Sequence, residues 1–268
     1  MTDRPYVVLS AAMSVDGYLD DAGPERLRLS NALDFDRVDQ VRAASDAILI
    51  GANTMRRDNP RLLVNSDRRR AQRVADGKPE YPLKVTVTRS GDLSADLRFW
   101  HVGGEKLVIT VDRAVEKVRA ALGDLADVVG IGPDLDWGLV LDELGRRGVE
   151  RLMVEGGGSI HTQLMAADLA DEVHLAIAPL VVGQPEAARF LGAAAYPGGP
   201  AVRMRVLEVR AVDDVVLVRY SPRSVSDVHT HPSSGPALDA ACDRPRRTVP
   251  SGRRRLLGRR GHRRRGRR

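Results

Sequence analysis

Glycine and polar side chains gather where three nearly continuous apolar segments of the sequence end. These positions are Ser14–Gly17, Gly51–Thr54 and Glu155–Ser159. An apolar run that ends in such residues is typical of a buried strand followed by a ligand-binding turn, because ligands of open α/β sheets bind at the carboxyl ends of the strands. The three segments are therefore the candidate binding positions of this chain.

Three consecutive glycines, Gly156 to Gly158, are the most informative of these positions. Without a Cβ atom their backbone allows a ligand to approach closely. The helix predicted to follow, with Ser159 and Ile160 in its first turn, offers unpaired N–H groups and a positive dipole end, which suit a phosphate. A tight strand-to-helix turn with no ligand explains the same pattern, and the spacing is not Gly-x-Gly-x-x-Gly. The motif alone leaves both interpretations open.

The polar residues beside these turns also have two interpretations each. Thr54 is suited to bond a phosphate or ribose, or to cap the turn before Pro60. Glu155 is either a ligand acceptor or a partner of a helix dipole. Asp16 fits an ordinary turn aspartate better than a functional one. Hydrolase chemistry is poorly supported, since residues 1–221 contain no Gly-x-Ser-x-Gly elbow and no Cys/His pair, and the chain has no Walker or His-Glu-x-x-His motif.

Alternating strand-like and helical segments must hold these residues in place. Apolar runs predict strands at 6–12, 46–51, 83–88, 106–111, 127–131, 151–154 and 172–182. Two late strands, 201–212 and 215–220, flank Asp213-Asp214 and predict an antiparallel hairpin. The repeated alternation of strand and helix indicates an α/β fold, with a mostly parallel sheet and helices on both of its faces.

Two helices follow from the spacing of apolar residues. One is predicted over 33–44, with Phe35, Val38 and Val41 on its buried face. The other covers 136–147, with Asp136 as its N-cap residue. Gly148 ends this helix. The polar segment 64–82 is predicted to be an excursion on the surface.

Charge is divided unevenly along the chain. Residues 222–268 contain 14 Arg, no Lys and three Asp, a net of +11, so the total of +6 leaves −5 for residues 1–221. We therefore predict a folded domain over 1–221 and an Arg/Pro-rich disordered tail over 222–268, whose removal leaves stability and activity unchanged. The acidic domain makes nucleic acid an unexpected partner, although the tail itself is either an anion-binding segment or a solvated extension.

Cysteine content and hydropathy bear on disulfides, metal sites and the cellular location of the protein. The one cysteine, Cys242, excludes an internal disulfide and a Cys-rich zinc module. Two tail histidines, His229 and His231, are a weak metal motif, and no metal site is predicted. No apolar stretch reaches 18 residues and the N-terminus does not have the pattern of a signal peptide, so we expect a cytoplasmic protein without membrane spans.

Four motifs taken together resemble the reductase domain of bacterial riboflavin biosynthesis, a member of the dihydrofolate-reductase-like superfamily. They are Ala12-Met-Ser-Val-Asp-Gly17, Arg42 through Thr54, Asp58-Asn-Pro-Arg-Leu62, and Val154-Glu-Gly-Gly157. The resemblance covers about residues 4–221, with the motifs in the same order and spacing.

This resemblance implies a three-layer α/β fold, NADPH as cofactor, a small-molecule substrate and a homodimer. It implies hydride transfer to C1′ of a phosphoribosylamino-pyrimidine of the 5-amino-6-(5-phosphoribosylamino)uracil type, which opens the ribose to a ribityl chain. The implied cofactor-binding residues are Met13, Gly51, Ala52, Thr54, Asp58, Gly156, Gly157, Gly158, Ser159 and Ile160. The implied substrate-binding residues are Arg42, Leu62 and Glu155. No catalytic residue is assigned.

The chain departs from the family pattern at positions expected to hold a substrate phosphate. Ser10 and Asn65 stand where the family often has Lys and Arg, and Arg28 lies in a segment that often contains Trp. Arg28 and Arg61 are possible replacements. An alternative acceptor without that phosphate is a dihydrofolate or another dihydropteridine.

Two further expectations concern the cofactor and the type of protein. Arg56, Arg57 and Arg89 lie near strand ends and are candidates to bind the 2′-phosphate that distinguishes NADPH from NADH. The zinc-dependent deaminase that accompanies the bacterial reductase is absent, because the chain has neither His-x-Glu nor Pro-Cys-x-x-Cys. A different class of function is a nucleotide-binding protein that engages RNA through its basic tail.

Overall fold

A nine-stranded sheet organises the computed structural model, which describes residues 4–222. The strands are β1 (Tyr6–Ser14), β2 (Ala47–Gly51), β3 (Leu83–Thr88), β4 (Lys106–Thr110), β5 (Asp127–Gly130), β6 (Arg151–Gly156), β7 (Glu172–Ala178), β8 (Arg205–Val212) and β9 (Val215–Ser221). Their order across the sheet is β5-β4-β3-β2-β6-β1-β7-β9-β8. The strands from β5 to β7 pair in parallel, and β9 is antiparallel to both β7 and β8. The predicted mostly parallel sheet with a C-terminal hairpin is confirmed.

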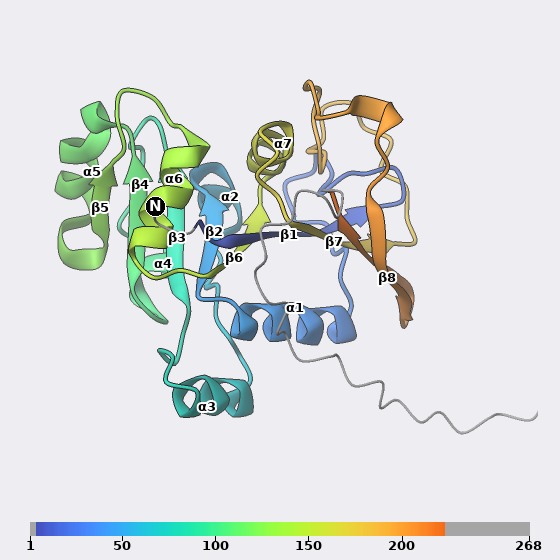
Figure 1. Ribbon diagram of the computed structural model, residues 1–268, viewed down its shortest axis with the longest axis horizontal. Helices are drawn as coiled ribbons and strands as arrows, with labels where there is room; N and C mark the ends of the chain where they lie inside the picture. Colours follow the sequence, from blue (N-terminus) through green and yellow to red (C-terminus); the bar gives the residue numbers. More distant parts are fainter. Residues whose placement is uncertain (1–3, 223–268) are drawn as a thin grey trace, which may run out of the picture. The chain divides into compact units, whose positions relative to one another are not determined.

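Helices cover both faces of this sheet, and α1 and α7 lie on opposite sides of it (Figure 1). The α-helices are α1 (Ala32–Ala44), α2 (Ala52–Asp58), α3 (Asp67–Ala75), α4 (Arg98–His101), α5 (Val115–Leu122), α6 (Trp137–Arg146) and α7 (Gly158–Ala166). Short 3-10 helices are η1 (Asp112–Ala114), η2 (Gly123–Leu125) and η3 (Gly199–Ala201). The capping aspartate predicted for α6 is confirmed, because the Asp136 carboxylate accepts a hydrogen bond from the N–H of Leu139 at 3.0 Å.

The central strand β2 is apolar at every position because both of its faces are buried. Leu49 packs into a core shared with α6 and α7, whereas Ile48 and Ile50 pack into a second core with α2, α4 and α5. Successive strand residues point to opposite faces, so a strand covered on both sides has no solvent-facing position. The strand is rigid for the same reason, and it gives the residues at its carboxyl end a fixed position.

The order β2-β6-β1 places the three strands that precede the candidate binding segments side by side. Ile50 of β2 pairs with Gly156 of β6, and β6 pairs with β1 on its other side. All three strands run in parallel, so their carboxyl ends lie at the same edge of the sheet. The residues at positions 51–54 and 155–159 therefore border one region, but β1 lines it with residues 10–12 and not with the predicted segment 14–17.

The predicted buried face of the helix over 33–44 is partly wrong. Phe35 in α1 is 56% exposed, whereas Asp34 is fully buried, and Val38 and Val41 are half-buried. Adjacent helix residues differ in direction by about 100°, so Asp34, and not Phe35, shares the inner face with Val38 and Val41. An ion pair of 2.7 Å with Arg37 offsets the cost of burying the Asp34 carboxylate.

Two strand boundaries also differ from prediction. The strand expected over 172–182 ends at Ala178, because its pairing with β1 stops where Ser14 ends that strand. The strand expected over 201–212 begins at Arg205, which pairs with the last residue of β9, Ser221. In both cases the extent of the neighbouring strand, which local sequence does not reveal, sets the length.

The remaining predictions for the fold concern the surface and the tail. The polar segment 64–82 contains helix α3, which was not predicted and which begins after Ser66. The predicted tail beyond 222, with His229, His231 and Cys242, lies outside the described residues. Among the residues that the structure describes, none of the helices is both long and apolar enough to cross a membrane.

Candidate active site

A cleft of about 1000 Å³ opens where the carboxyl ends of β1, β2 and β6 meet. Eleven of the thirteen predicted site residues line it: Arg42, Gly51, Ala52, Thr54, Asp58, Leu62, Glu155, Gly157, Gly158, Ser159 and Ile160. The other two, Met13 and Gly156, are not among its lining residues. Met13 packs against the core instead, and Gly156 is the last residue of β6, with a φ of +122° that suits glycine.

The turn from β6 into α7 forms one wall of the cleft. Gly157 is the N-cap residue of α7, and no side chain caps the first N–H groups of that helix. A Cβ atom on Gly157 would lie 2.8 Å from the hydroxyl oxygen of Thr54. A Cβ atom on Gly158 would lie 2.0 Å from the carbonyl oxygen of Arg189, so that glycine is required for the turn itself. The peptide between Gly156 and Gly157 is cis.

A second helix begins at the same place. Helix α2 starts directly after β2, its N-cap residue is Gly51, and no side chain caps it either. Thr54 lies in the first turn of α2 and faces Gly157 across the cleft. Two helix N-termini with uncapped N–H groups thus converge, and each contributes a partial positive charge. This arrangement fits the diphosphate of a dinucleotide such as NADPH, which the glycine turn leaves room to approach.

The two predicted substrate residues Arg42 and Glu155 form a bidentate ion pair. Nε and Nη2 of Arg42 each donate to one carboxylate oxygen of Glu155, both at 2.6 Å. The two side chains are 16% and 15% exposed and border the cleft. Burial opposes the charge on Arg42, but the Glu155 carboxylate outweighs it, so the pKa of Arg42 is raised. The carboxylate keeps free lone pairs for donors on a ligand.

Several other arginine residues line the cleft. Arg26, Arg28, Arg37 and Arg57 all contribute to its lining. Arg26 lies 3.6 Å from the carboxylate of Asp58, and Arg57 lies 3.0 Å from that of Asp20. Sequence reasoning did not identify Arg26 or Arg37, because the loop and helix that carry them have no glycine motif, and only their positive charge marks them.

The positions that depart from the family pattern lie in the same region. Ser10, Arg28 and Asn65 all line the cleft. Arg28 thus borders the cleft, and its role as a replacement for the missing cation stays a prediction. The side chain of Arg61 is not part of the lining, although its backbone carbonyl has a role described below.

Histidines and carboxylates elsewhere in the described residues serve the fold. His174 is buried, and its Nε2 lies 2.6 Å from a carboxylate oxygen of Glu172, which also accepts a hydrogen bond from Arg219 at 2.9 Å. Asp16 binds the N–H groups of Val182 and Gly183 as a turn aspartate. Within residues 4–222, no three His, Cys, Asp or Glu side chains are grouped to hold a metal ion.

Comparison with known proteins identifies the family of this chain. The profile of the family described as the RibD C-terminal domain matches residues 5–218. This chain belongs to the RibD C-terminal domain family. Two relatives named 2,5-diamino-6-ribosylamino-4(3H)-pyrimidinone 5′-phosphate reductase are those of Archaeoglobus fulgidus and Methanothermobacter thermautotrophicus. The first is 36% identical over 67% of this chain and 83% of its own length. The second is 30% identical over 81% of this chain and 98% of its own length.

Solved structures of bifunctional RibD proteins share the fold. The deaminase/reductase of Thermotoga maritima has a TM-score of 0.67 at 24% identity, covering 82% of this chain and 57% of that chain. Acinetobacter baumannii RibD has a TM-score of 0.68 at 21% identity, covering 82% of this chain and 59% of the other. The chain thus spans little more than half of these bifunctional proteins. The predicted family, its fold and an oxidoreductase of riboflavin biosynthesis are confirmed.

Proposed function

We propose that this chain is a cytoplasmic reductase that uses NADPH to convert the ribosyl group of a ribosylamino-pyrimidine 5′-phosphate to a ribityl group. The observation that carries the proposal is that one cleft contains both a candidate dinucleotide site and a candidate pyrimidine site. The uncapped turn Gly157–Ser159 and Thr54 provide a site for the diphosphate of a dinucleotide, and the Arg42–Glu155 pair lies in the same cleft. The cytoplasmic location rests on the cysteine content of the chain.

The residues of the chain bind and orient both reactants. When bound, NADPH would supply the hydride, and the backbone N–H groups at the N-termini of α2 and α7 would hold its diphosphate. Glu155 accepts hydrogen bonds from the amino and ring N–H groups of the pyrimidine, while Arg42 fixes the orientation of that carboxylate. Leu62 packs beside the ring. Alignment of two bound reactants by rigid groups is a major source of rate enhancement.

The names of the relatives favour a substrate that keeps its 2-amino group, so that reduction precedes deamination. We therefore propose 2,5-diamino-6-ribosylamino-4(3H)-pyrimidinone 5′-phosphate in preference to the corresponding uracil. The test is NADPH oxidation with each pyrimidine and with dihydrofolate in parallel. The diamino compound should give the highest kcat/KM. A higher value with dihydrofolate would refute the proposal, and a higher value with the uracil would refute the choice of pyrimidine.

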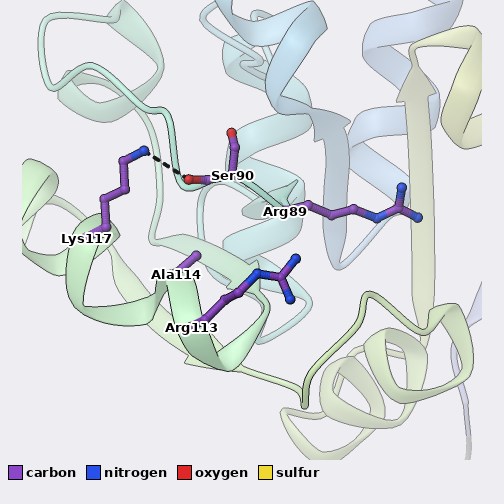
Figure 2. Close-up of a pocket in the computed structure, with 5 residues that line it drawn as sticks. All are labelled: Arg89, Ser90, Arg113, Ala114 and Lys117. Atoms are coloured by element: carbon purple, nitrogen blue, oxygen red, sulfur yellow. Dashed lines mark hydrogen bonds between the residues drawn. The ribbon is translucent and has the colours of Figure 1, made fainter.

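A pocket of about 370 Å³ beside the cleft supports NADPH over NADH. It shares Arg89 and Ser90 with the cleft, and Arg113 and Lys117 complete it. Figure 2 shows these side chains around the pocket, with Lys117 donating to the carbonyl of Ser90 at 3.1 Å. Positive groups next to a dinucleotide cleft suit a 2′-phosphate. Of the three predicted arginines, Arg89 lies at this pocket.

We expect Arg113→Ala to reduce kcat/KM for NADPH about tenfold, because a charged hydrogen bond contributes roughly 1.5–3 kcal/mol. The value for NADH, which has no 2′-phosphate, should stay within about twofold. Steady-state kinetics with both cofactors measures the ratio. Arg119→Ala is the matched control, since Arg119 is exposed on the following helix α5 and pairs with Glu116 outside the pocket. Equal losses for both cofactors in Arg113→Ala would contradict this assignment.

An exposed apolar patch on the hairpin supports a homodimer. Val206, Val209 and Val216 are 56%, 61% and 42% exposed, and the strand register places them on the same face of β8 and β9. Strand β8 is also the edge of the sheet. Edge strands of soluble proteins are usually short, charged or covered. We therefore propose that a second copy of this chain covers the patch.

We expect the protein to elute as a dimer and Val209→Glu to elute as a monomer, because a carboxylate at the patch cannot be buried without a partner. Size-exclusion chromatography with light scattering gives the mass of each. Val181→Glu is the control, since Val181 is 72% exposed but lies outside the hairpin. A monomeric wild-type protein would disprove the homodimer.

A further inference from the structure

Lys84, the second residue of β3, is a fully buried lysine that plays no part in the mechanism above. Its side chain is 0% exposed. Its Nζ donates to the carbonyl oxygens of Arg61 at 3.0 Å and Val102 at 2.9 Å, and to that of Phe99. Nζ also lies 4.4 Å from the centre of the Phe99 ring. Burial of an ammonium group is costly, and these contacts offset that cost.

Leu62 lies between two carbonyl groups that cations hold in place. Its φ is +47°, a left-handed conformation that branched side chains rarely adopt. Its side chain is only 5% exposed and borders the cleft. Lys84 binds the carbonyl oxygen of the residue before it, Arg61, and Nη1 of Arg42 binds that of the residue after it, Leu63, at 3.0 Å.

This arrangement connects Lys84 to the Arg42–Glu155 pair. The guanidinium group of Arg42 uses one nitrogen for the Leu63 carbonyl and the other two for the Glu155 carboxylate. A shift of the Arg61–Leu63 backbone would therefore move both Leu62 and the orientation of Glu155. Strained backbone conformations persist only where the surrounding contacts fix them.

The ammonium form of Lys84 matches its surroundings. It has three N–H donors for three carbonyl oxygens, whereas a neutral amine has two donors and a lone pair that would face an oxygen. Burial lowers the pKa of Lys84 to about 7, and the positive charges of Lys106 on β4 and Arg42 on α1 act in the same direction. The loop at Arg61 and the segment at Phe99 and Val102 face Nζ with carbonyl groups and the aromatic ring.

We infer that Lys84 is a positioning residue for the pyrimidine substrate, because it holds the Arg61 carbonyl so that Leu62 keeps its place in the cleft wall beside Arg42 and Glu155. This inference rests on the proposed function. The hydrogen bonds of Lys84 and Arg42 end at Arg61, Leu63, Phe99, Val102 and Glu155, so we expect the effect to be confined to the pyrimidine half of the cleft.

The test is Lys84→Met, which keeps the length of the side chain and removes its charge and donors. At pH 6.5 we expect the KM for the pyrimidine to rise about tenfold, equivalent to about 1.4 kcal/mol, with kcat and the Kd for NADPH within about twofold. Amide hydrogen exchange in residues 60–64 should accelerate. Lys106→Met is the matched control, because Lys106 pairs with Lys84 in the strand register but its Nζ lies near Gly103.

A pH series separates positioning from a loss of general stability. The ratio of the variant KM to the wild-type KM cancels titration of the substrate itself. It should fall toward one as the pH rises from about 6 to about 8.5, because Lys84 loses its proton in the wild-type protein across that range. Exchange of residues 60–64 in the wild-type protein, corrected for intrinsic rates, should rise over the same range. This second measurement needs no variant and remains available if Lys84→Met does not fold.

The outcomes distinguish the inference from the proposed function. If wild-type protein does not reduce the pyrimidine, the proposed function fails whatever the exchange data show. If it does, an unchanged KM in folded Lys84→Met overturns the inference. Equal weakening of pyrimidine and NADPH binding overturns it as well, as does wild-type exchange in residues 60–64 that is independent of pH.

Discussion

Gly157→Val is expected to weaken NADPH binding by roughly 100-fold or more, which corresponds to about 2.7 kcal/mol. A Cβ atom at this position lies 2.8 Å from the Thr54 hydroxyl, so a branched side chain fills the space between the N-termini of α2 and α7. The diphosphate then cannot reach the backbone N–H groups of either helix. Isothermal titration calorimetry measures the loss directly.

Two other glycines provide the controls for this experiment. Gly192→Ala places a Cβ atom 3.5 Å from Thr162, an ordinary contact, and should leave NADPH affinity unchanged. Gly158→Ala places one 2.0 Å from a backbone carbonyl and should destabilise the fold itself. Circular dichroism and thermal melts identify which variants remain folded. A folded Gly157→Val protein with normal NADPH affinity would show that the cofactor does not bind at this turn.

Glu155→Gln is expected to lower kcat/KM for the pyrimidine tenfold or more, with little change in the Kd for NADPH. The amide keeps one acceptor oxygen but places an NH2 group opposite the guanidinium of Arg42 and the N–H groups of the substrate. A charged hydrogen bond of this kind contributes roughly 1.5–3 kcal/mol. Steady-state kinetics and cofactor titration on the same preparation give both values.

Arg42→Ala distinguishes a substrate role from a purely structural one, because the two residues pair with each other. Loss of the guanidinium leaves the Glu155 carboxylate without its partner and frees the carbonyl of Leu63, so both stability and the pyrimidine KM should suffer. A double-mutant cycle with Glu155→Gln measures their coupling. Variants that lose stability but keep normal kinetics at low temperature would assign the pair to the fold alone.

Local sequence was sufficient for most of the sheet. Runs such as Ile48–Ile50 contain no polar residue. A strand needs an apolar residue at every position only where helices cover both faces of the sheet. Prediction failed where the neighbour decides the outcome. The end of β7 follows the end of β1, and Asp34 lies on the inner face of α1 in place of Phe35, where Arg37 pairs with it.

What the sequence indicated by itself was which turns are candidates to bind a ligand. Gly156–Gly158 and Gly51–Thr54 are recognisable because a missing Cβ atom and a following helix are local properties. The tertiary structure alone decided that these turns meet, since the order β2-β6-β1 is not the order of the chain. It also decided that Arg42 pairs with Glu155, which lies 113 residues away, and that Lys84 binds the carbonyl group of Arg61. Such contacts depend on how strands and helices pack, and no local pattern of residue types specifies that packing.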